Sequence, residues 1–241
     1  MLFRLLRPWM LMSISAWYFF STALKLLTSG DFRTLTSWPA FHGTWFANFW
    51  AHIAPGVKAN AEMRVLALLE GRVREGHIYE EVVGQPVEGI VLEIGAGSGM
   101  WVDVFATIAE RTKRSGSSAP PLSKIYGVEP NAQSAAALQQ RVKESGLDGT
   151  YEVVPVGIED LNNPTAWGTH IEPGTVDCIV TVQCLCSIPE PEKNVRLLYN
   201  YLKKGGRWYV YEHVRAEYGT VVPYFQGKKQ PPVFKHTGIM V

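Results

Sequence analysis

Residues 89–99, Gly-Ile-Val-Leu-Glu-Ile-Gly-Ala-Gly-Ser-Gly, constrain the fold of this chain more than any other stretch. The run 90–94 is short and apolar, as in a buried strand, and it leads directly into a glycine-rich turn. Residues 100–111 follow with helical spacing of apolar side chains, including Phe105 and Ile108. A glycine turn between a strand and a helix lets backbone approach a ligand and offers it the unpaired N–H groups of the helix N-terminus. The stretch therefore predicts a nucleotide-cofactor site.

The spacing of the glycines distinguishes between cofactors. Gly95, Gly97 and Gly99 alternate, whereas the dinucleotide fingerprint has two residues between its second and third glycines. Glu93 lies two positions before the first glycine, where a carboxylate would disfavour a pyrophosphate. A cofactor with an amino group and a sulfonium cation suits this turn better. The pattern favours S-adenosylmethionine, and an NAD-dependent oxidoreductase is the less favoured alternative.

Downstream of Val87, strand-like and helix-like patterns alternate, which predicts a parallel sheet with crossover helices. The tract 112–124, rich in serine and proline, is expected to be an exposed loop. Glycines 205 and 206 are expected to close the last helix in a left-handed cap. The fold class is therefore α/β, a Rossmann-like, doubly wound and mostly parallel sheet of about five strands. The expected strands lie near 90–94, 125–129, 151–155, 176–182 and 207–213, and the expected helices near 99–111, 131–145 and 190–203.

Further polar residues follow the ends of the expected strands. Glu129 ends the second strand, where an acid accepts hydrogen bonds from ribose hydroxyls in doubly wound folds. The alternative is that Glu129 caps the next helix. Ile158 and Glu159 follow the third strand and are placed to read an adenine edge, the alternative being a solvated loop. Gln183 and Cys184 follow the fourth strand, where the reactive end of a cofactor faces the substrate.

The acceptor chemistry rests on fewer residues. Methyl transfer needs a base only if the acceptor must first lose a proton. His213 is the best candidate base, because it ends a strand on the ligand-binding edge and titrates near neutrality. A hydrogen-bonded core histidine is the alternative. Cys184 and Cys186 have no partner residues at ligand spacing, so no metal site is expected.

The order of these motifs resembles that of class I S-adenosylmethionine-dependent methyltransferases. More narrowly, residues 182–187, 202–207 and 211–214 resemble the methyltransferase-like 7 group and its fungal relatives. The resemblance covers 87–218. It implies Glu93, Gly95, Gly97 and Gly99 at the methionine end of the cofactor, Glu129 on the ribose, Ile158 and Glu159 beside the adenine, and Gln183 and Cys184 beneath the methionyl portion.

The resemblance also implies a membrane-anchored enzyme that methylates small acceptors, including thiols. The expected reaction is methylation of a small, rather apolar acceptor at a thiol, hydroxyl or amine, in specialised metabolism. Two residues depart from the common pattern. Gly157 stands where many relatives carry an acid for the adenine amino group, and Lys204 replaces a common proline in the glycine turn before the last strand. Neither departure removes an indispensable contact.

The N-terminus carries the only strong compositional bias. Arg4 and Arg7 introduce the apolar stretch 8–27, which has about the length needed to cross a bilayer core, roughly 20 residues. Several serines and Lys25 dilute the stretch, so a helix lying in the membrane interface is an alternative. A buried helix and a cleaved signal peptide are further alternatives, although aromatic residues occupy the place of a cleavage site. Membrane association of either kind is favoured.

Composition limits the partners and the compartment. A length of 241 residues with 46% apolar residues suits one domain plus an extension. The net charge of +1 gives no electrostatic basis for nucleic-acid binding. Three cysteines without a disulfide framework favour a reducing compartment. The expected location is a membrane surface, such as that of the endoplasmic reticulum or a lipid droplet, with the catalytic domain in the cytosol.

Four segments are expected along the chain. They are a hydrophobic helix (1–30), an aromatic-rich helical segment (31–86), the S-adenosylmethionine-binding domain (87–218) and an irregular tail (219–241). The aromatic residues between 31 and 54 either pack in a core or line a substrate cavity. A helix is expected from Pro55 to about Glu75.

The tail shows no pattern for closing strands, so the resemblance implies a truncated acceptor half and an unprotected edge on the fifth strand. A non-catalytic methyltransferase-fold protein is therefore the alternative function.

Overall fold

The computed structural model describes residues 2–115, 121–213 and 238–240. The chain forms two compact units, Met1–Asn60 and Ala61–Val241, and the division between them falls inside helix α3 (Trp38–Leu69). The expected irregular tail lies outside the described residues except at 238–240. Part of the expected 112–124 loop is instead helical, because helix α4 (Val102–Ser115) extends into it.

The first unit is a helical hairpin. Helix α1 (Leu2–Ser29) connects through the short α2 (Phe32–Thr36) to the first part of α3. Trp45 Nε1 donates to the Ser15 carbonyl at 3.0 Å, and Asn48 Nδ2 donates to Thr22 Oγ1 at 3.1 Å. The two helices are therefore linked by hydrogen bonds at two levels.

Aromatic residues fill the contact between the two helices of the hairpin. Phe19 packs edge-on against Phe41 and Trp45, with ring centroids 5.0 and 5.4 Å apart. Phe41 is buried, so part of the aromatic segment has a packing role. The stretch Trp9–Ser29 is long and apolar enough to cross a membrane by length and composition. Its large exposed apolar side chains are Trp9, Met10, Met12, Trp17, Phe20, Leu24 and Leu27.

The expected helix start at Pro55 is wrong, because α3 already begins at Trp38 and contains Pro55 in its interior. A proline inside a helix removes one backbone hydrogen bond and strains the preceding turn, but it need not end the helix. The aromatic residues before Pro55 supply enough packing against α1 to keep both sides helical.

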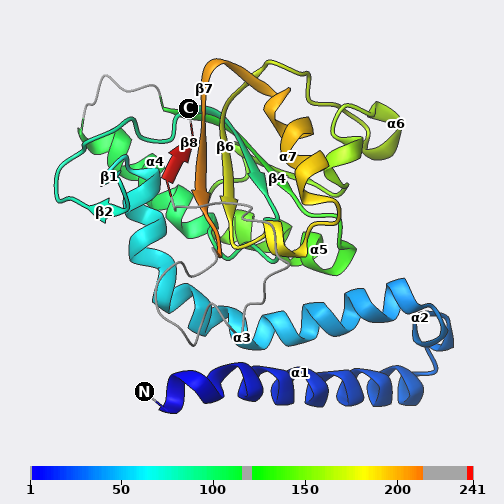
Figure 1. Cartoon of the computed structure of the whole chain (residues 1–241). Helices are drawn as coiled ribbons and strands as arrows, with labels where there is room; N and C mark the ends of the chain where they lie inside the picture. The colour runs from blue at the N-terminus through cyan, green and yellow to red at the C-terminus, as the bar shows by residue number, and fades with distance from the viewer. Residues whose placement is uncertain (1, 116–120, 214–237, 241) are drawn as a thin grey trace. The chain divides into compact units, whose positions relative to one another are not determined.

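The second unit contains a six-stranded sheet of order β5-β4-β3-β6-β7-β8 (Figure 1). The first five strands of that order are parallel, which confirms the doubly wound α/β prediction. A separate hairpin, β1 (Val73–Arg74) and β2 (His77–Ile78), turns through Glu75 and Gly76, which both have positive φ. The strands of the large sheet are β3 (Gly89–Ile94), β4 (Leu122–Val128), β5 (Tyr151–Val154), β6 (Val176–Val182), β7 (Leu202–Tyr211) and β8 (Gly238–Met240).

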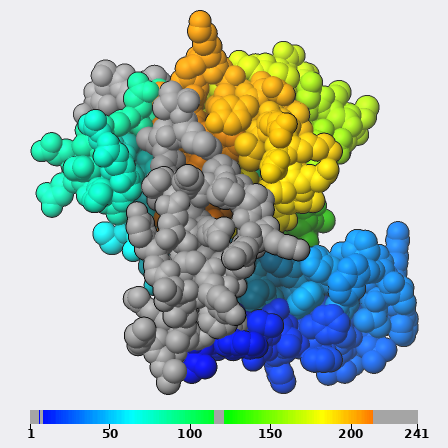
Figure 2. Space-filling view, viewed as in Figure 1, coloured from blue at the N-terminus to red at the C-terminus, as the bar shows by residue number. Residues whose placement is uncertain are grey.

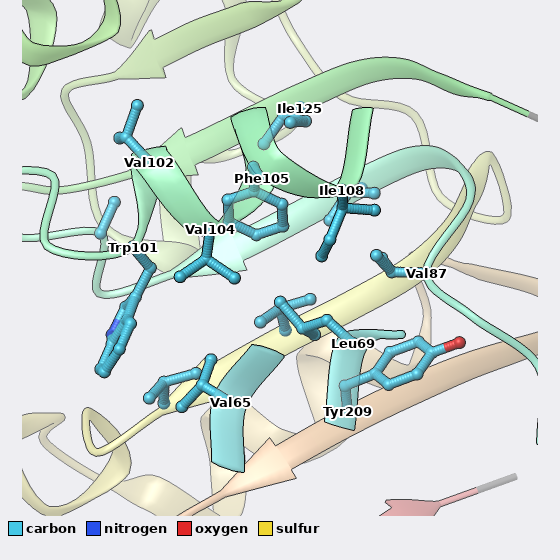
Figure 3. Packing of buried hydrophobic residues seen from close by; sticks show 14 of the residues in the cluster. Val65, Leu69, Val87, Trp101, Val102, Val104, Phe105, Ile108, Ile125 and Tyr209 are labelled. Carbon is cyan, nitrogen blue, oxygen red and sulfur yellow. The ribbon is translucent and has the colours of Figure 1, made fainter. Parts of the chain in front are cut away.

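Hydrophobic clusters cover both faces of the sheet, because successive side chains of a strand point to opposite sides. Val91 belongs to one cluster and its neighbour Leu92 to the other. The first cluster joins the strands to α4, to α5 (Ala132–Glu144) and to the end of α3, as Figure 3 shows for Phe105, Ile108 and Leu69. The second cluster includes residues of α7 (Pro191–Tyr199) and of the 3₁₀ turn η1 (Ile158–Asp160).

Side chains of α7 and of the short α6 (Pro164–Trp167) form outer surface on one side of the second unit (Figure 2). The sheet is thus a middle layer between helices, as parallel sheets require.

Two details of the last strands differ from expectation. Residues 202–206 were expected to end a helix, but α7 stops at Tyr199 and these residues already belong to β7. Gly205, with φ +81°, lies where the pairing with β6 shifts register, so the glycines make a bulge rather than a helix cap. The edge of β7 was expected to be unprotected, but β8 pairs with it antiparallel from Trp208 to Val210. Three residues are too few to show strand alternation in the sequence.

Candidate functional site

The carboxyl ends of the five parallel strands meet at one edge of the sheet, where ligands bind in doubly wound folds. The glycine turn follows β3, Glu129 follows β4 and η1 follows β5. Gln183 and Cys184 follow β6, and Glu212 and His213 follow β7. The structure thus brings the loops that carry the expected site residues to a single edge.

The three glycines of the turn share a left-handed backbone conformation but differ in their surroundings. All have positive φ, at +68° for Gly95, +58° for Gly97 and +85° for Gly99, which L side chains rarely adopt. A Cβ on Gly95 would lie 2.5 Å from Cβ of Cys184, so the turn after β6 packs directly on Gly95. Around Gly97, the backbone oxygen of Gly95 at 3.9 Å is the neighbour that a Cβ would meet. Gly97 therefore presents an open face, while Gly95 presents a closed one.

The carboxylate of Glu129 is held by two backbone donors. Oε2 accepts from Gly97 N–H at 3.0 Å, and Oε1 accepts from Asn131 N–H at 2.9 Å. The helix-cap alternative for Glu129 is wrong, because the Asn131 side chain caps α5 by accepting from Ser134 N–H at 3.0 Å. Burial raises the pKa of Glu129, and its two backbone hydrogen bonds partly offset this. The carboxylate is fixed beside the open face of Gly97.

Glu93 lies beneath the glycine turn, with 2% of its surface exposed. The Tyr151 hydroxyl donates to its carboxylate, and Phe105 packs edge-on against the Tyr151 ring. Gly127 makes room for this pair, because a Cβ there would lie 2.6 Å from Cζ of Tyr151. Burial raises the pKa of Glu93 to about 7, although the Tyr151 hydrogen bond opposes the shift. The sequence pointed to Glu93 but not to Tyr151, which is 58 residues away along the chain.

The turn after β5 places a carboxylate where residue 157 has no side chain. A Cβ on Gly157 would lie 2.5 Å from Oε1 and 2.6 Å from Oε2 of Glu159. Ile158 is buried in the second cluster and Glu159 is exposed. The carboxylate of Glu159 therefore fills the space beside Gly157 that a side chain at 157 would enter.

The turn after β6 is constrained by residues of β7. Gln183 has φ +53°, and its backbone N–H donates to the Tyr211 carbonyl at 2.8 Å. Among the described residues, nothing hydrogen-bonds to the buried Oε1 of Gln183. Oε1 of Glu212 accepts from Cys184 N–H at 3.0 Å and from Leu185 N–H at 3.2 Å. Sequence reasoning missed Glu212, although an acid at the end of β7 repeats the placement of Glu129 after β4.

His213 and Cys186 lie near enough to each other at this edge to shift each other's pKa. Both residues are exposed, so the core-histidine alternative for His213 is wrong. The hydrogen bond to Cys186 raises the pKa of His213, and the bond to His213 lowers the pKa of the Cys186 thiol. Glu212 acts in the opposite sense on the thiol, raising its pKa. The pair favours a thiolate beside an imidazolium more than two separate groups would.

The Cys186 thiol should accordingly react fast with an electrophile. At pH 7 we expect iodoacetamide to alkylate Cys186 in the folded protein, and His213→Ala to slow the reaction about threefold, because the thiol pKa rises and less thiolate forms. The rates of the two proteins should converge at high pH, where both thiols are ionised. Peptide mass spectrometry measures the labelling, with the buried Cys178 and Cys184, whose pKa values are raised, as internal controls. Identical rates at every pH would contradict the pairing.

Comparisons with known proteins find several that are similar to this chain. The chain is 26% identical over 142 residues to human thiol S-methyltransferase TMT1A, covering 58% of this chain and 49% of that protein. The chain thus spans about half the length of this curated relative. The solved structures that match include a SAM-dependent methyltransferase from Aquifex aeolicus, at 17% identity and a TM-score of 0.40, covering 72% of this chain and 68% of that one.

A second similar structure is the SAM-dependent methyltransferase from Thiobacillus denitrificans in complex with S-adenosyl-L-homocysteine. It has 16% identity and a TM-score of 0.39, covering 60% of this chain and 46% of that one. The family model described as a methyltransferase domain matches residues 69–225, which is more than half of the chain. The chain therefore belongs to the methyltransferase-domain family.

Proposed function

We propose that this protein transfers the methyl group of S-adenosylmethionine to a small, rather apolar acceptor, with a thiol as the acceptor class. The observation that carries the proposal is the open face of Gly97 beside the fixed carboxylate of Glu129. This arrangement lies at the edge of the sheet where doubly wound folds bind nucleotide cofactors. Family membership adds the reaction class.

The residues at this edge fit the donor. Each oxygen of Glu129 uses one lone pair on a backbone N–H and retains capacity to accept from a ribose hydroxyl. At the other end, the orphaned Oε1 of Gln183 is a buried acceptor suited to the amino group of the donor. The glycine turn, with Gly95, Gly97 and Gly99, allows close backbone approach, and Cys184 closes its far side.

S-adenosylmethionine supplies an activated methyl group on a sulfonium sulfur. The chain then has to exclude water, orient the acceptor and receive a proton if the acceptor is a thiol. His213 is the proposed base, because its side chain is exposed at the same edge and a neutral imidazole can accept a proton. Only the neutral imidazole can accept this proton, and the interaction with Cys186 raises the pKa of His213, so the base form appears at a higher pH than in a free histidine.

The thiol class is supported by the thiol S-methyltransferase relative. Thiols also need little more than deprotonation and alignment, which suits a site in which His213 is the proposed base.

Two measurements test this function. Isothermal titration should show saturable binding of S-adenosylmethionine, and Gly97→Val should abolish it, since the new side chain would fill the open face. Gly146→Val is the matched control, because Gly146 also has positive φ but lies in open space after α5. A panel of small thiols and phenols with labelled donor then identifies the acceptor. Equal binding by the parent and the Gly97 variant would contradict the proposal.

Glu159 should determine the selectivity of the site for adenine over other nucleobases in the cofactor. Its carboxylate, placed over Gly157, would accept the adenine amino group, which S-inosylhomocysteine lacks. For Glu159→Gln we expect the preference for S-adenosylhomocysteine over the inosine analogue to fall roughly tenfold. The exposed Glu172→Gln serves as the control. Competition titration measures the ratio, and an unchanged ratio would leave Glu159 a solvated loop residue.

Membrane attachment through α1 is part of the proposed function, with the second unit on the cytosolic side. The exposed apolar face of α1 supports it, and an apolar acceptor would concentrate in the bilayer. Deleting residues 1–30 should move the protein from the carbonate-resistant membrane fraction to the supernatant. The double variant Trp17→Lys and Phe20→Lys is the sharper test, because both side chains are exposed, whereas Phe19 makes the ring contacts to α3 and is retained. Undiminished membrane retention in both variants would refute attachment through α1.

A further inference from the structure

The buried carboxylate of Glu212 has no role in the proposed reaction so far. We propose that Glu212 is a positioning residue that holds the turn 183–185 against the glycine turn, and so determines the affinity for the amino-acid end of the methyl donor. This inference rests on the proposed function, because it names the residue that shapes one half of the same site.

The contacts of Glu212 all converge on this turn. Only 7% of its surface is exposed. Oε1 accepts from the backbone N–H groups of Cys184 and Leu185 at 3.0 and 3.2 Å, and the Cys184 thiol lies 3.5 Å from the same oxygen. A buried carboxylate is costly unless hydrogen bonds satisfy it, and two unpaired N–H groups beyond a strand end are costly as well. The Glu212 carboxylate and the two N–H groups satisfy one another, so the turn is fixed to the end of β7.

The same turn carries a strained residue. Gln183 adopts a left-handed backbone conformation with φ +53°, which is unfavourable for a residue other than glycine. Such a conformation persists only where the surrounding structure determines it. Here the hydrogen bond from Gln183 N–H to the Tyr211 carbonyl fixes the residue on one side, and the Glu212 contacts to Cys184 fix it on the other.

The turn transmits its position to the glycine turn by direct packing. Cβ of Cys184 would be 2.5 Å from a Cβ on Gly95, so no side chain separates the two turns. Oε1 of Gln183, the residue before Cys184, is buried and lacks a hydrogen-bond partner among the described residues. An orphaned acceptor of this kind calls for a donor group on a ligand.

The sheet order determines which end of the donor this is. β3 lies between β4 and β6, so Glu129 after β4 and the turn after β6 flank the glycine turn from opposite sides. With the ribose on Glu129, the amino-acid end of the donor faces the turn held by Glu212. Loss of Glu212 should therefore affect ligands that contain the amino acid and spare ligands that end at the nucleoside.

Titration calorimetry with S-adenosylhomocysteine and with adenosine tests the assignment. For Glu212→Ala we expect about a tenfold loss of affinity for S-adenosylhomocysteine and an unchanged affinity for adenosine. Glu212→Gln keeps an oxygen at the position of Oε1 and should retain the parent affinity for both ligands. Glu172→Ala, at an exposed acid of the same unit, is the control and should match the parent.

Melting curves establish that each variant is folded. If Glu212→Ala does not fold, Glu212→Asp takes its place, because its shorter carboxylate cannot span the same distance and should show the same selective loss. Equal losses for both ligands, or no loss for either, would overturn the role of Glu212 alone. A parent protein that binds neither ligand would instead overturn the proposed function and this inference with it.

Discussion

Replacement of Glu129 by alanine is expected to weaken the binding of S-adenosylmethionine about 30-fold. Two ribose hydroxyls would lose a charged acceptor, and each such hydrogen bond is worth roughly 1.5–3 kcal/mol, of which water recovers part at a partly open site. A net loss of about 2 kcal/mol corresponds to this factor. The variant also frees the N–H of Gly97, so the glycine turn should become less ordered.

Asn131→Ala is the matched control for Glu129. It removes the side-chain cap of α5 and should lower the free energy of unfolding by about 1 kcal/mol, with donor affinity unchanged. Calorimetric dissociation constants and melting midpoints, measured on both variants, separate the two roles. A lowered midpoint with unchanged affinity in Glu129→Ala would remove Glu129 from the site.

The pH dependence gives a second check on Glu129. Burial raises its pKa, so its carboxylate takes up a proton at a higher pH than a free glutamate does. Protonation removes the charged acceptor, and donor affinity should therefore fall as the pH is lowered toward and through that raised pKa. Glu129→Gln should lack this dependence.

Gly127→Ala is expected to destabilise the second unit by about 3 kcal/mol. The new methyl group would lie 2.6 Å from Cζ of Tyr151 and even closer to its hydroxyl, so the ring must move. Movement of Tyr151 breaks its hydrogen bond to Glu93 and leaves that buried carboxyl group without its partner. Both consequences act on the free energy of unfolding.

Denaturant unfolding of Gly127→Ala should be compared with Gly149→Ala, which places the same methyl group in open space. The control should change the free energy of unfolding by less than about 0.5 kcal/mol. The double variant Gly127→Ala with Tyr151→Ala should lose less stability than the sum of the single variants, because the steric conflict then disappears. Equal stability of the parent and Gly127→Ala would show that the Tyr151 ring is not confined as described.

The sequence predicted the sheet well because its strands are buried on both faces. Residues 90–94 and 176–182 are nearly continuous apolar runs, a pattern that depends only on local composition. Glycines suit both a helix end and a strand bulge, so the sequence of 202–206 predicted a helix end where the structure has the start of β7. The pairing of β7 with β6 selects the bulge over the helix end, and the local sequence cannot predict this long-range pairing.

The sequence predicted those site residues that belong to a contiguous motif or follow a strand directly. It did not predict those that act through partners far away in the chain. Gly95, Gly97 and Gly99 form one local pattern, and Glu129 stands at a fixed place after a strand. Tyr151 and Glu212 act through hydrogen bonds to residues 58 and 28 positions away. No sequence spacing specifies such contacts, since they arise only when the strands assemble.

The central place of β3 in the sheet has a consequence for synthesis of the protein on the ribosome. Ile90 at the start of β3 donates its N–H to the Asp177 carboxylate at the start of β6, a partner 87 residues later in the chain. The strand that leads into the glycine turn therefore keeps the backbone N–H and C=O groups of one edge unpaired until β6 has been synthesised. Long-range parallel pairing of this kind is slow and exposes the nascent chain to aggregation.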